Sequence, residues 1–228
     1  MEEFERIKKI ITEEDFKCLE NTKILIIGIG GVGGYALETI IRSGIRNITI
    51  VDADKIDISN FNRQIIATSK TIGMDKCTAY KKRAEEINPK VKIKVISEFI
   101  LENNISKLFN TKYDYIIDAC DTISTKIALI KMASEKNIKI ISCMGVGNKF
   151  DPTKLSITKL SKTSYDPVAK AMRKILKEQN INQDIFVVSS TEKPVITKDR
   201  IPGSMVMVPA VAGIYCASFV INNILNKS

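Results

Sequence analysis

The feature that most constrains this chain is an apolar run that meets a cluster of glycines and then a helix-like pattern, ILIIGIGGVGGYALETII at residues 24–41. Such an apolar run is typical of a strand buried on both faces of a parallel sheet. In a Gly-x-Gly-x-x-Gly pattern, the first glycine permits a tight turn, the second lets the backbone approach a phosphate, and the third lets the helix pack closely. Free N–H groups at the start of the helix favour an anion. We therefore predict a nucleotide site that includes Gly28, Gly30, Gly31 and Gly33.

Strand-like and helix-like segments alternate around this cluster. The expected strands lie at about 23–27, 46–52, 90–97, 113–120 and 138–145, and the expected helices at about 3–20, from the glycines to 43, 71–88 and 124–137. This alternation predicts an α/β fold with a doubly wound, Rossmann-like, mostly parallel sheet. After residue 145 we expect a C-terminal extension of short strands and helices, with a basic helix at 167–180. The stretch 187–204 lacks periodicity and is predicted to be a mobile loop.

Length and charge bound the organisation of the chain. With 228 residues it can form one well-filled core, and we expect a single domain over residues 1–228. Within it we distinguish a helical arm at 1–22, a nucleotide-binding core at 23–148 and a substrate-side extension with the last helix at 149–228. The excess of 35 Lys and Arg over 26 Asp and Glu suits a polyanionic partner such as RNA, and it equally suits a lysine-rich solvated surface.

The residue types that the chain lacks exclude several chemistries. There is no histidine, which removes a histidine base, a histidine nucleophile and every histidine metal site. The five cysteines never form Cys-x-x-Cys, so a zinc-ribbon site is not expected. Isolated cysteines in odd number are typical of a reducing compartment, and we expect the protein in the cytoplasm. Residues 205–225 carry no charge and could cross a bilayer, but their proline, glycine and asparagines favour a packed or peripheral helix over a membrane span.

The polar residues after the second strand distinguish between nucleotides. Asp52 ends that strand, where a carboxylate can accept hydrogen bonds from ribose hydroxyl groups, and Asp54 follows it. A triphosphate attacked at its α-phosphorus needs cations around the departing pyrophosphate, whereas a dinucleotide needs few. Arg63 and Lys76 can supply this charge, which favours ATP over a nicotinamide dinucleotide. Two further candidates for nucleotide contacts are Asn60 and Gln64.

Two acidic residues lie where a central strand is expected to end. The stretch IIDACDT places Asp118 and Asp121 at the carboxyl edge of the sheet, where open α/β sheets bind their ligands. A carboxylate there can hold Mg²⁺ against the phosphates of a nucleotide. Asp121 is the better candidate for the metal, because Asp118 can equally be a turn residue at the strand end. Both are predicted to contribute to the nucleotide site.

Together these motifs resemble the E1-like adenylating superfamily, which includes the activators of ubiquitin-like and sulfur-carrier proteins. The resemblance covers about residues 4–148 and rests on GIGGVGG, VDAD, NFNRQ, GMDK, INP and DACD. It implies an enzyme that converts a carboxylate to an acyl-adenylate with ATP and Mg²⁺. It also implies a homodimer, because an N-terminal arginine of this family, here Arg6, enters the site of the neighbouring subunit. The other implied roles are ribose binding for Asp52, phosphate contacts for Asn60, Arg63 and Lys76, and metal binding for Asp121.

The segment after the core resembles one branch of that superfamily, the tRNA threonylcarbamoyladenosine dehydratases. The resemblance rests on DPT, on TSYDP with the basic helix that follows, and on GSMVMVPAVAG. Members of this branch adenylate the carboxylate of the modified base beside the anticodon, and a group of the same side chain then closes a ring and expels AMP. That intramolecular attack needs neither a cysteine nor a histidine. The cations expected to follow the RNA backbone are Lys162, Lys170, Arg173, Lys174 and Lys177.

Three other hypotheses remain open from the sequence. The first is an adenylating activator of a ubiquitin-like or sulfur-carrier protein, although residues 149–204 contain no cysteine that could act as its nucleophile. The second is a non-catalytic nucleotide-binding scaffold, and the third is a dehydrogenase. Within the dehydratase hypothesis, a sulfur-handling protein is a further candidate partner.

Overall fold

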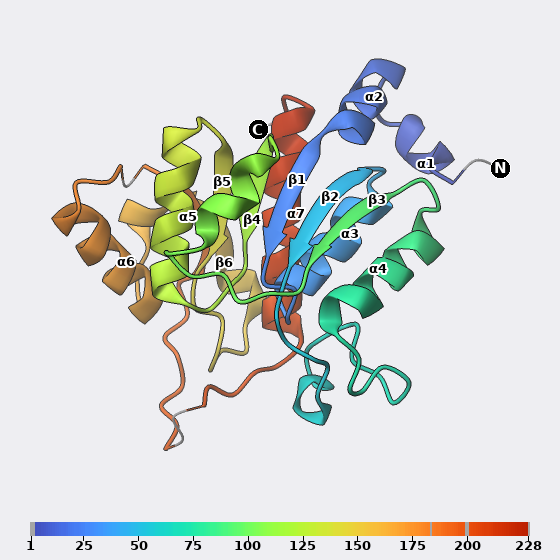
Figure 1. The fold of residues 1–228 in the computed structure, drawn as a ribbon. Helices are drawn as coiled ribbons and strands as arrows, with labels where there is room; N and C mark the ends of the chain where they lie inside the picture. Colours follow the sequence, from blue (N-terminus) through green and yellow to red (C-terminus); the bar gives the residue numbers. More distant parts are fainter. Residues whose placement is uncertain (1–2, 183, 199–200, 228) are drawn as a thin grey trace.

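The computed structural model, which describes residues 3–182, 184–198 and 201–227, is built around a seven-stranded sheet (Figure 1). The strands are β1 (Lys23–Ile27), β2 (Asn47–Val51), β3 (Lys92–Ile96), β4 (Tyr115–Asp118), β5 (Lys139–Cys143), β6 (Leu155–Lys159) and β7 (Phe186–Ser190). Their order across the sheet is β3-β2-β1-β4-β5-β7-β6, and β6 alone of these strands pairs antiparallel, with β7. The predicted mostly parallel sheet is confirmed.

Helices cover both faces of this sheet. They are α1 (Glu5–Lys8), α2 (Glu13–Asn21), α3 (Gly33–Arg42), α4 (Lys76–Ile87), α5 (Ile123–Glu135), α6 (Pro167–Glu178) and α7 (Met207–Ile224), with 3₁₀ turns η1 (Ile58–Asn60), η2 (Ile105–Asn110), η3 (Pro152–Lys154) and η4 (Leu160–Lys162). Figure 1 shows α3, α4 and α7 on one face and α5 and α6 on the other. In β1, Ile24 and Ile26 pack with the first group, whereas Leu25 and Ile27 pack with the second. The continuous apolar run therefore follows from burial on both faces.

The parallel strands end together at one edge of the sheet, which lies at the bottom of Figure 1. The segments that follow β1, β2, β4, β5 and β7 all begin at this carboxyl edge. Helix α1 and the end of α7 lie at the opposite edge. In a doubly wound sheet, the carboxyl edge is where a ligand is expected, next to the strand at which the connections change direction.

Three expected elements have different bounds, each for a local or a tertiary reason. The helix predicted over 3–20 is two helices, because Thr12 begins α2 in a capping box in which it exchanges hydrogen bonds with Asp15. The helix predicted from 71 begins at 76, since Asp75 caps it by accepting from the N–H of Thr78 at 2.8 Å. Residues 187–190 were expected in a loop and instead form most of β7, which pairs with two other strands.

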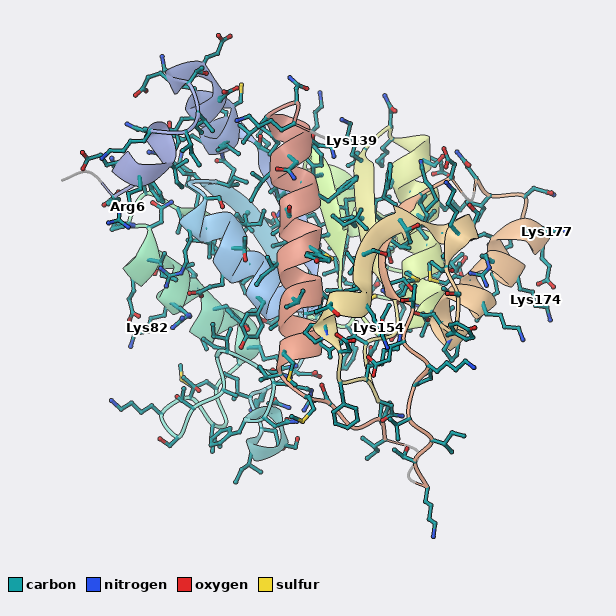
Figure 2. The ribbon with its side chains drawn as sticks, turned by 180° about the vertical axis from the view of Figure 1, so that it is seen from behind. Arg6, Lys82, Lys139, Lys154, Lys174 and Lys177 are labelled. Carbon is teal, nitrogen blue, oxygen red and sulfur yellow. The ribbon has the colours of Figure 1, made fainter. Side chains whose placement is uncertain are left out.

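The apolar helix α7 packs lengthwise against the sheet and α3, as Figure 2 shows from behind. By length and composition alone it could cross a membrane, with a mean hydropathy of 1.5 over an 18-residue window that is 44% buried. It lies directly against the start of α3 at Gly213, where an added Cβ would lie 2.2 Å from the carbonyl oxygen of Val32. The expectation of a helix packed on the sheet is met.

A buried carboxylate connects two helices of one face, and this connection should make the stability of the fold sensitive to acid. Glu38 of α3 accepts hydrogen bonds from Arg83 of α4 at 2.7 and 2.9 Å and from Arg42 at 2.8 Å. Burial raises the pKa of Glu38, but the two guanidinium groups outweigh it, and the pKa is lowered overall. A lowered folded-state pKa contributes stability above the ordinary value and loses it as the pH falls through the folded value.

We therefore expect Glu38→Gln to lower the free energy of unfolding at pH 7 and to lower it less at pH 3.5. Urea unfolding at both pH values measures the difference. The exposed Glu14 provides the control, because Glu14→Gln should leave the pH dependence of the wild-type protein unchanged. An equal effect of Glu38→Gln at both pH values would contradict the role of its charge.

Candidate nucleotide site at the carboxyl edge of the sheet

The glycine turn after β1 has the shape that a phosphate-binding turn requires. Gly28 has a φ of +79°, and an added Cβ would lie 2.7 Å from the carbonyl oxygen of Ala119, at the end of β4. At Gly33 a Cβ would lie 1.8 Å from the carbonyl oxygen of Gly28, so the start of α3 packs directly on the turn. Around Gly30 the space is open, with the side-chain Nε2 of Gln64 at 3.6 Å as the nearest atom. A ligand can therefore approach the backbone here.

Gln64 and Arg63 lie over this turn. An added Cβ at Gly31 would lie 3.4 Å from Cγ of Arg63. The guanidinium group of Arg63 donates to the carbonyl oxygen of Ser59 at 2.8 Å and to Oδ1 of Asn62 at 3.0 Å. Gln64 is 6% exposed, and its Oε1 is buried without a hydrogen-bond partner. An unsatisfied buried polar atom beside an open glycine backbone fits a bound polar ligand.

The segment that carries these two residues is held by Asn60. The backbone carbonyl of Asn60 accepts from the N–H groups of Arg63 and Gln64 at 3.1 and 2.9 Å. Its side-chain Oδ1 accepts from the N–H of Asp57 at 3.1 Å and closes the turn η1. Asn60 is buried, so its first function is to fix the turn. The donor that a phosphate oxygen would need is its side-chain amide.

Asp52, Asp54 and Lys76 form a second cluster beside the glycine turn. Asp52 accepts from the N–H of Ile29 at 2.9 Å and ties the end of β2 to the turn. The ammonium of Lys76, which is 4% exposed, lies 2.7 Å from Asp54 and 3.5 Å from Asp52. It neutralises carboxylates that would otherwise repel a phosphate. Since the side chain of Asp54 is 55% exposed, this carboxylate can turn to water when an anion takes its place at Lys76.

The structure separates the two acidic residues at the end of β4. Asp118 is fully buried, and its carboxylate accepts from Nζ of Lys126 at 3.1 Å, from the N–H of Cys120 at 3.2 Å and from Oγ of Ser142. It therefore faces the interior and not a ligand, in contrast to the expectation that it contributes to the nucleotide site. Asp121 is exposed at the carboxyl edge.

Asp121 fits the part expected of a magnesium ligand. Among the described residues, no group of three or more cysteine or acidic side chains is arranged to hold a metal. Mg²⁺ often binds through one or two carboxylates together with phosphates and water, without a complete protein cage. Asp121 would then hold the ion jointly with a nucleotide, and the ion would neutralise phosphate charge.

Two cations of the sequence analysis lie away from this cluster. Arg6 is exposed on α1, at the end of the molecule opposite to the carboxyl edge (Figure 2). It does not reach the site of its own subunit.

Arg173 was expected to face RNA, but its guanidinium donates to the carbonyl oxygens of Leu160 and Thr163 at 3.2 and 3.3 Å and to the Thr163 hydroxyl. Arg173 therefore holds the turn before α6 through these bonds, and its contact with RNA stays a prediction.

Lys126 is the residue of this region that the sequence analysis missed. It is fully buried, and besides Asp118 it donates to the carbonyl oxygen of Cys143 at 2.8 Å. Burial lowers its pKa, but the Asp118 carboxylate outweighs this and raises the pKa overall, so the Lys126 ammonium keeps its charge. The available signal was one lysine within an otherwise apolar stretch of helix, TKIALI. The pair anchors the loop that presents Asp121.

Removing one partner of this ion pair should destabilise the fold. Lys126→Met leaves a buried unpaired carboxylate, and we expect a loss of about 3–5 kcal/mol in the free energy of unfolding. The double variant Lys126→Met with Asp118→Asn should recover part of this loss, because no buried charge remains. Urea unfolding measures both. The exposed Lys131 of the same helix is the control, since Lys131→Met should change stability by less than about 0.5 kcal/mol.

The two glycines of the turn should respond differently to alanine. In Gly30→Ala the added methyl meets only the flexible end of Gln64, so we expect the wild-type melting temperature within a few degrees. The methyl nevertheless occupies the ligand's approach, and ATP should bind about 10- to 100-fold more weakly through lost charged hydrogen bonds. Gly33→Ala should unfold the protein, because its methyl collides with backbone. Calorimetric titration and thermal unfolding measure these effects, and unchanged ATP affinity in Gly30→Ala would contradict the assignment.

Comparison with known proteins agrees with this geometry. The sequence matches the ThiF family over residues 5–227. It is 35% identical to the tRNA threonylcarbamoyladenosine dehydratases of Bacillus subtilis and Haemophilus influenzae, over 99% and 98% of this chain and 95% and 94% of those proteins. A crystal structure of the Escherichia coli tRNA N6-threonylcarbamoyladenosine dehydratase in complex with ATP superposes with a TM-score of 0.93 at 31% identity, covering 99% of this chain and 94% of the other. The chain therefore belongs to the ThiF family of E1-like adenylating proteins.

Proposed function

We propose that this protein is an ATP-dependent dehydratase that closes the threonylcarbamoyl side chain of a modified adenosine in tRNA into a ring. In the first step, the side-chain carboxylate attacks the α-phosphorus of ATP and releases pyrophosphate. In the second, an oxygen or nitrogen of the same side chain attacks the activated carbonyl carbon and releases AMP. One water is lost from the nucleoside in total, and its oxygen leaves with AMP.

The observation that carries this proposal is the 35% identity, over nearly the full length of the chain, to proteins of that name. The open glycine turn, with Arg63, Gln64 and Lys76 around it, supports the same activity. The E. coli relative has been crystallised with ATP. The site of this chain has the two properties that adenylation needs: an exposed backbone for phosphate and cations on either side of it.

Each step of the first half-reaction has a residue suited to it. Asp52 is placed to accept hydrogen bonds from ribose. Arg63 and Lys76 would neutralise the charge that grows on the departing pyrophosphate, which is the main barrier to attack on a polyphosphate. Asp121 would hold Mg²⁺, which when bound withdraws charge from the phosphate oxygens. Asn60 positions Arg63 through the backbone hydrogen bond within its turn.

The second half-reaction requires no nucleophile from the protein. Cys120, close in sequence to Asp121, donates its thiol to Asp118 at 3.1 Å. Burial and this neighbouring carboxylate raise the pKa of the thiol well above its usual range, which keeps it protonated and unreactive. Cys216 and Cys77 are buried, and burial helps to raise the pKa of each thiol, to about 12 for Cys77. Ring closure by the substrate's own side chain avoids the need for a thiolate.

A homodimer in which Arg6 acts on the neighbouring site is part of the proposal. Within one subunit, Arg6 lies at the edge of the sheet opposite to the end of β4, which Asp121 follows, so it could act only on the site of another copy (Figure 2). A cation supplied in this way would add to the charge around the phosphates.

Activity is tested by mass spectrometry of nucleosides from modified tRNA incubated with the protein, ATP and Mg²⁺. The wild-type protein should remove the mass of one water from threonylcarbamoyladenosine. Arg63→Ala and Asp121→Asn should each lower the rate about 10²- to 10³-fold, through lost stabilisation of phosphate charge. Lys82→Ala removes an exposed cation of α4, six residues along the helix from Lys76, and should keep the wild-type rate. Full turnover by either site variant would count against the proposed roles.

The competing hypothesis of a carrier-protein activator gives a different result in the same assay. In that case modified tRNA would stay unchanged, and exchange of pyrophosphate into ATP would be stimulated by a ubiquitin-like protein ending in Gly-Gly. A scaffold would bind ATP without exchange. Dehydration of tRNA without any carrier protein selects the proposed function.

A further inference from the structure

The loop before α6 holds a tyrosine in a backbone conformation that asparagine adopts elsewhere in this chain. Tyr165 has a φ of +52°, in the left-handed region. The other non-glycine residues with positive φ in the described part of the chain are Asn137, Asn148, Asn180 and Asn226. Asparagine tolerates this region because its short polar side chain bonds locally, whereas a bulky side chain has no such compensation. Strained residues of this kind are concentrated at functional sites.

The ring of Tyr165 is presented to solvent beside a cation. It is 57% exposed, and Nζ of Lys193 lies 5.0 Å from the ring centroid. Lys162 and Lys170, both exposed, lie within five residues of it along the chain. An exposed aromatic face among lysines is the arrangement with which proteins stack single-stranded bases and neutralise the adjoining phosphates.

The backbone next to Tyr165 and the backbone next to Lys193 are both fixed by hydrogen bonds. The neighbour of Tyr165, Asp166, is 4% exposed and accepts from the N–H groups of Gly145 and Ala169 at 3.1 and 3.0 Å and from Oγ of Ser189 at 3.2 Å. On the other side, Glu192 next to Lys193 accepts from the N–H groups of residues 150 and 151. Because this backbone is already ordered, the two side chains lose little conformational entropy when a ligand binds.

The pair lies on the edge of the sheet that also carries the nucleotide site. Asp166 holds Gly145, which follows the end of β5, and Lys193 follows the end of β7. β5 lies next to β4, whose end presents Asp121, and β7 is the next strand. Two strand spacings amount to roughly 10 Å. The glycine turn and Asp52 lie on the far side of β4, at β1 and β2, so the end of β4 with Asp121 lies between them and the pair.

We propose that Tyr165 and Lys193 form a stacking platform for an unpaired base of the tRNA next to the reacting nucleotide. The ring receives the base, and the ammonium of Lys193 meets the adjoining phosphate. The threonylcarbamoyl arm then extends from its own base toward the α-phosphorus. This inference rests on the proposed function, because it takes the polyanion at this edge to be RNA.

Binding of an anticodon stem-loop RNA that carries threonylcarbamoyladenosine, with 2-aminopurine at the adjacent unpaired position, tests the platform. Tyr165→Asn removes the ring and at the same time relieves the backbone strain. We expect an RNA dissociation constant about tenfold larger and less quenching of 2-aminopurine, with a melting temperature equal to or above that of the wild type. Tyr165→Phe should stay within about twofold of the wild type and keep the quenching. ATP affinity should be unchanged in both.

The role of Lys193 is tested separately, and each variant has a matched control. Lys193→Ala should reduce the salt dependence of RNA binding by about one phosphate contact, whereas Lys82→Ala on α4 should not. Phe99 is 71% exposed after β3, and Phe99→Asn should leave RNA binding unchanged. If the wild type binds and dehydrates the RNA but Tyr165→Asn binds it equally well, the platform is refuted and the proposed function stands. If the wild type does not bind the modified RNA, both are refuted.

Discussion

The carboxyl edge of this sheet depends on two contacts that any side chain would prevent. At Gly33 the start of α3 packs on the carbonyl of Gly28, and at Gly213 the helix α7 packs on the carbonyl of Val32. These contacts hold α3 against the sheet and beside the last helix, with its free N–H groups directed to the edge where β1 ends. The candidate anion site therefore depends first on backbone packing, which fixes the position around which the cations lie.

The edge divides into two halves with different electrostatics. Around β1 and β2, Lys76 is buried and neutralised by Asp52 and Asp54, so an arriving phosphate replaces a carboxylate that can retreat into water. Beside β5 and β7, Lys162, Lys170 and Lys193 are exposed. The buried groups here are held internally, because Lys149 donates to the carbonyl oxygen of Gly145 and Asp166 accepts from backbone N–H groups. The first half suits one small, tightly held polyanion, and the second suits a long and flexible one whose charges stay hydrated.

Local patterns made the sheet and the glycine turn predictable, whereas side-chain direction depended on distant partners. Gly33 packs on Gly28, five residues before it, and the roles of both glycines follow from the motif, although Gly28 also packs on Ala119 at the end of β4. Asp118 and Asp121 look alike in sequence, but Asp118 is buried because Lys126 and Ser142 reach it from other elements. β7 escaped prediction for the same reason: its pairing with β5 and β6 comes from residues far along the chain, and its own short run ends in polar residues.

The absence of a reactive thiol at the candidate site would protect the acyl-adenylate of the proposed reaction. In the proposed reaction an acyl-adenylate must survive until the substrate's own group attacks, and an activated thiol nearby would capture it instead. Cys120 is close in sequence to Asp121, yet its thiol donates to Asp118 and has a raised pKa. Asp118 thus has two consequences: paired with Lys126 it fixes the loop of Asp121, and together with burial it raises the pKa of the adjoining Cys120 thiol. Since a well-oriented intramolecular nucleophile has an effective molarity of about 10⁵–10⁸ M, orientation of the RNA can replace both a histidine base and a cysteine nucleophile.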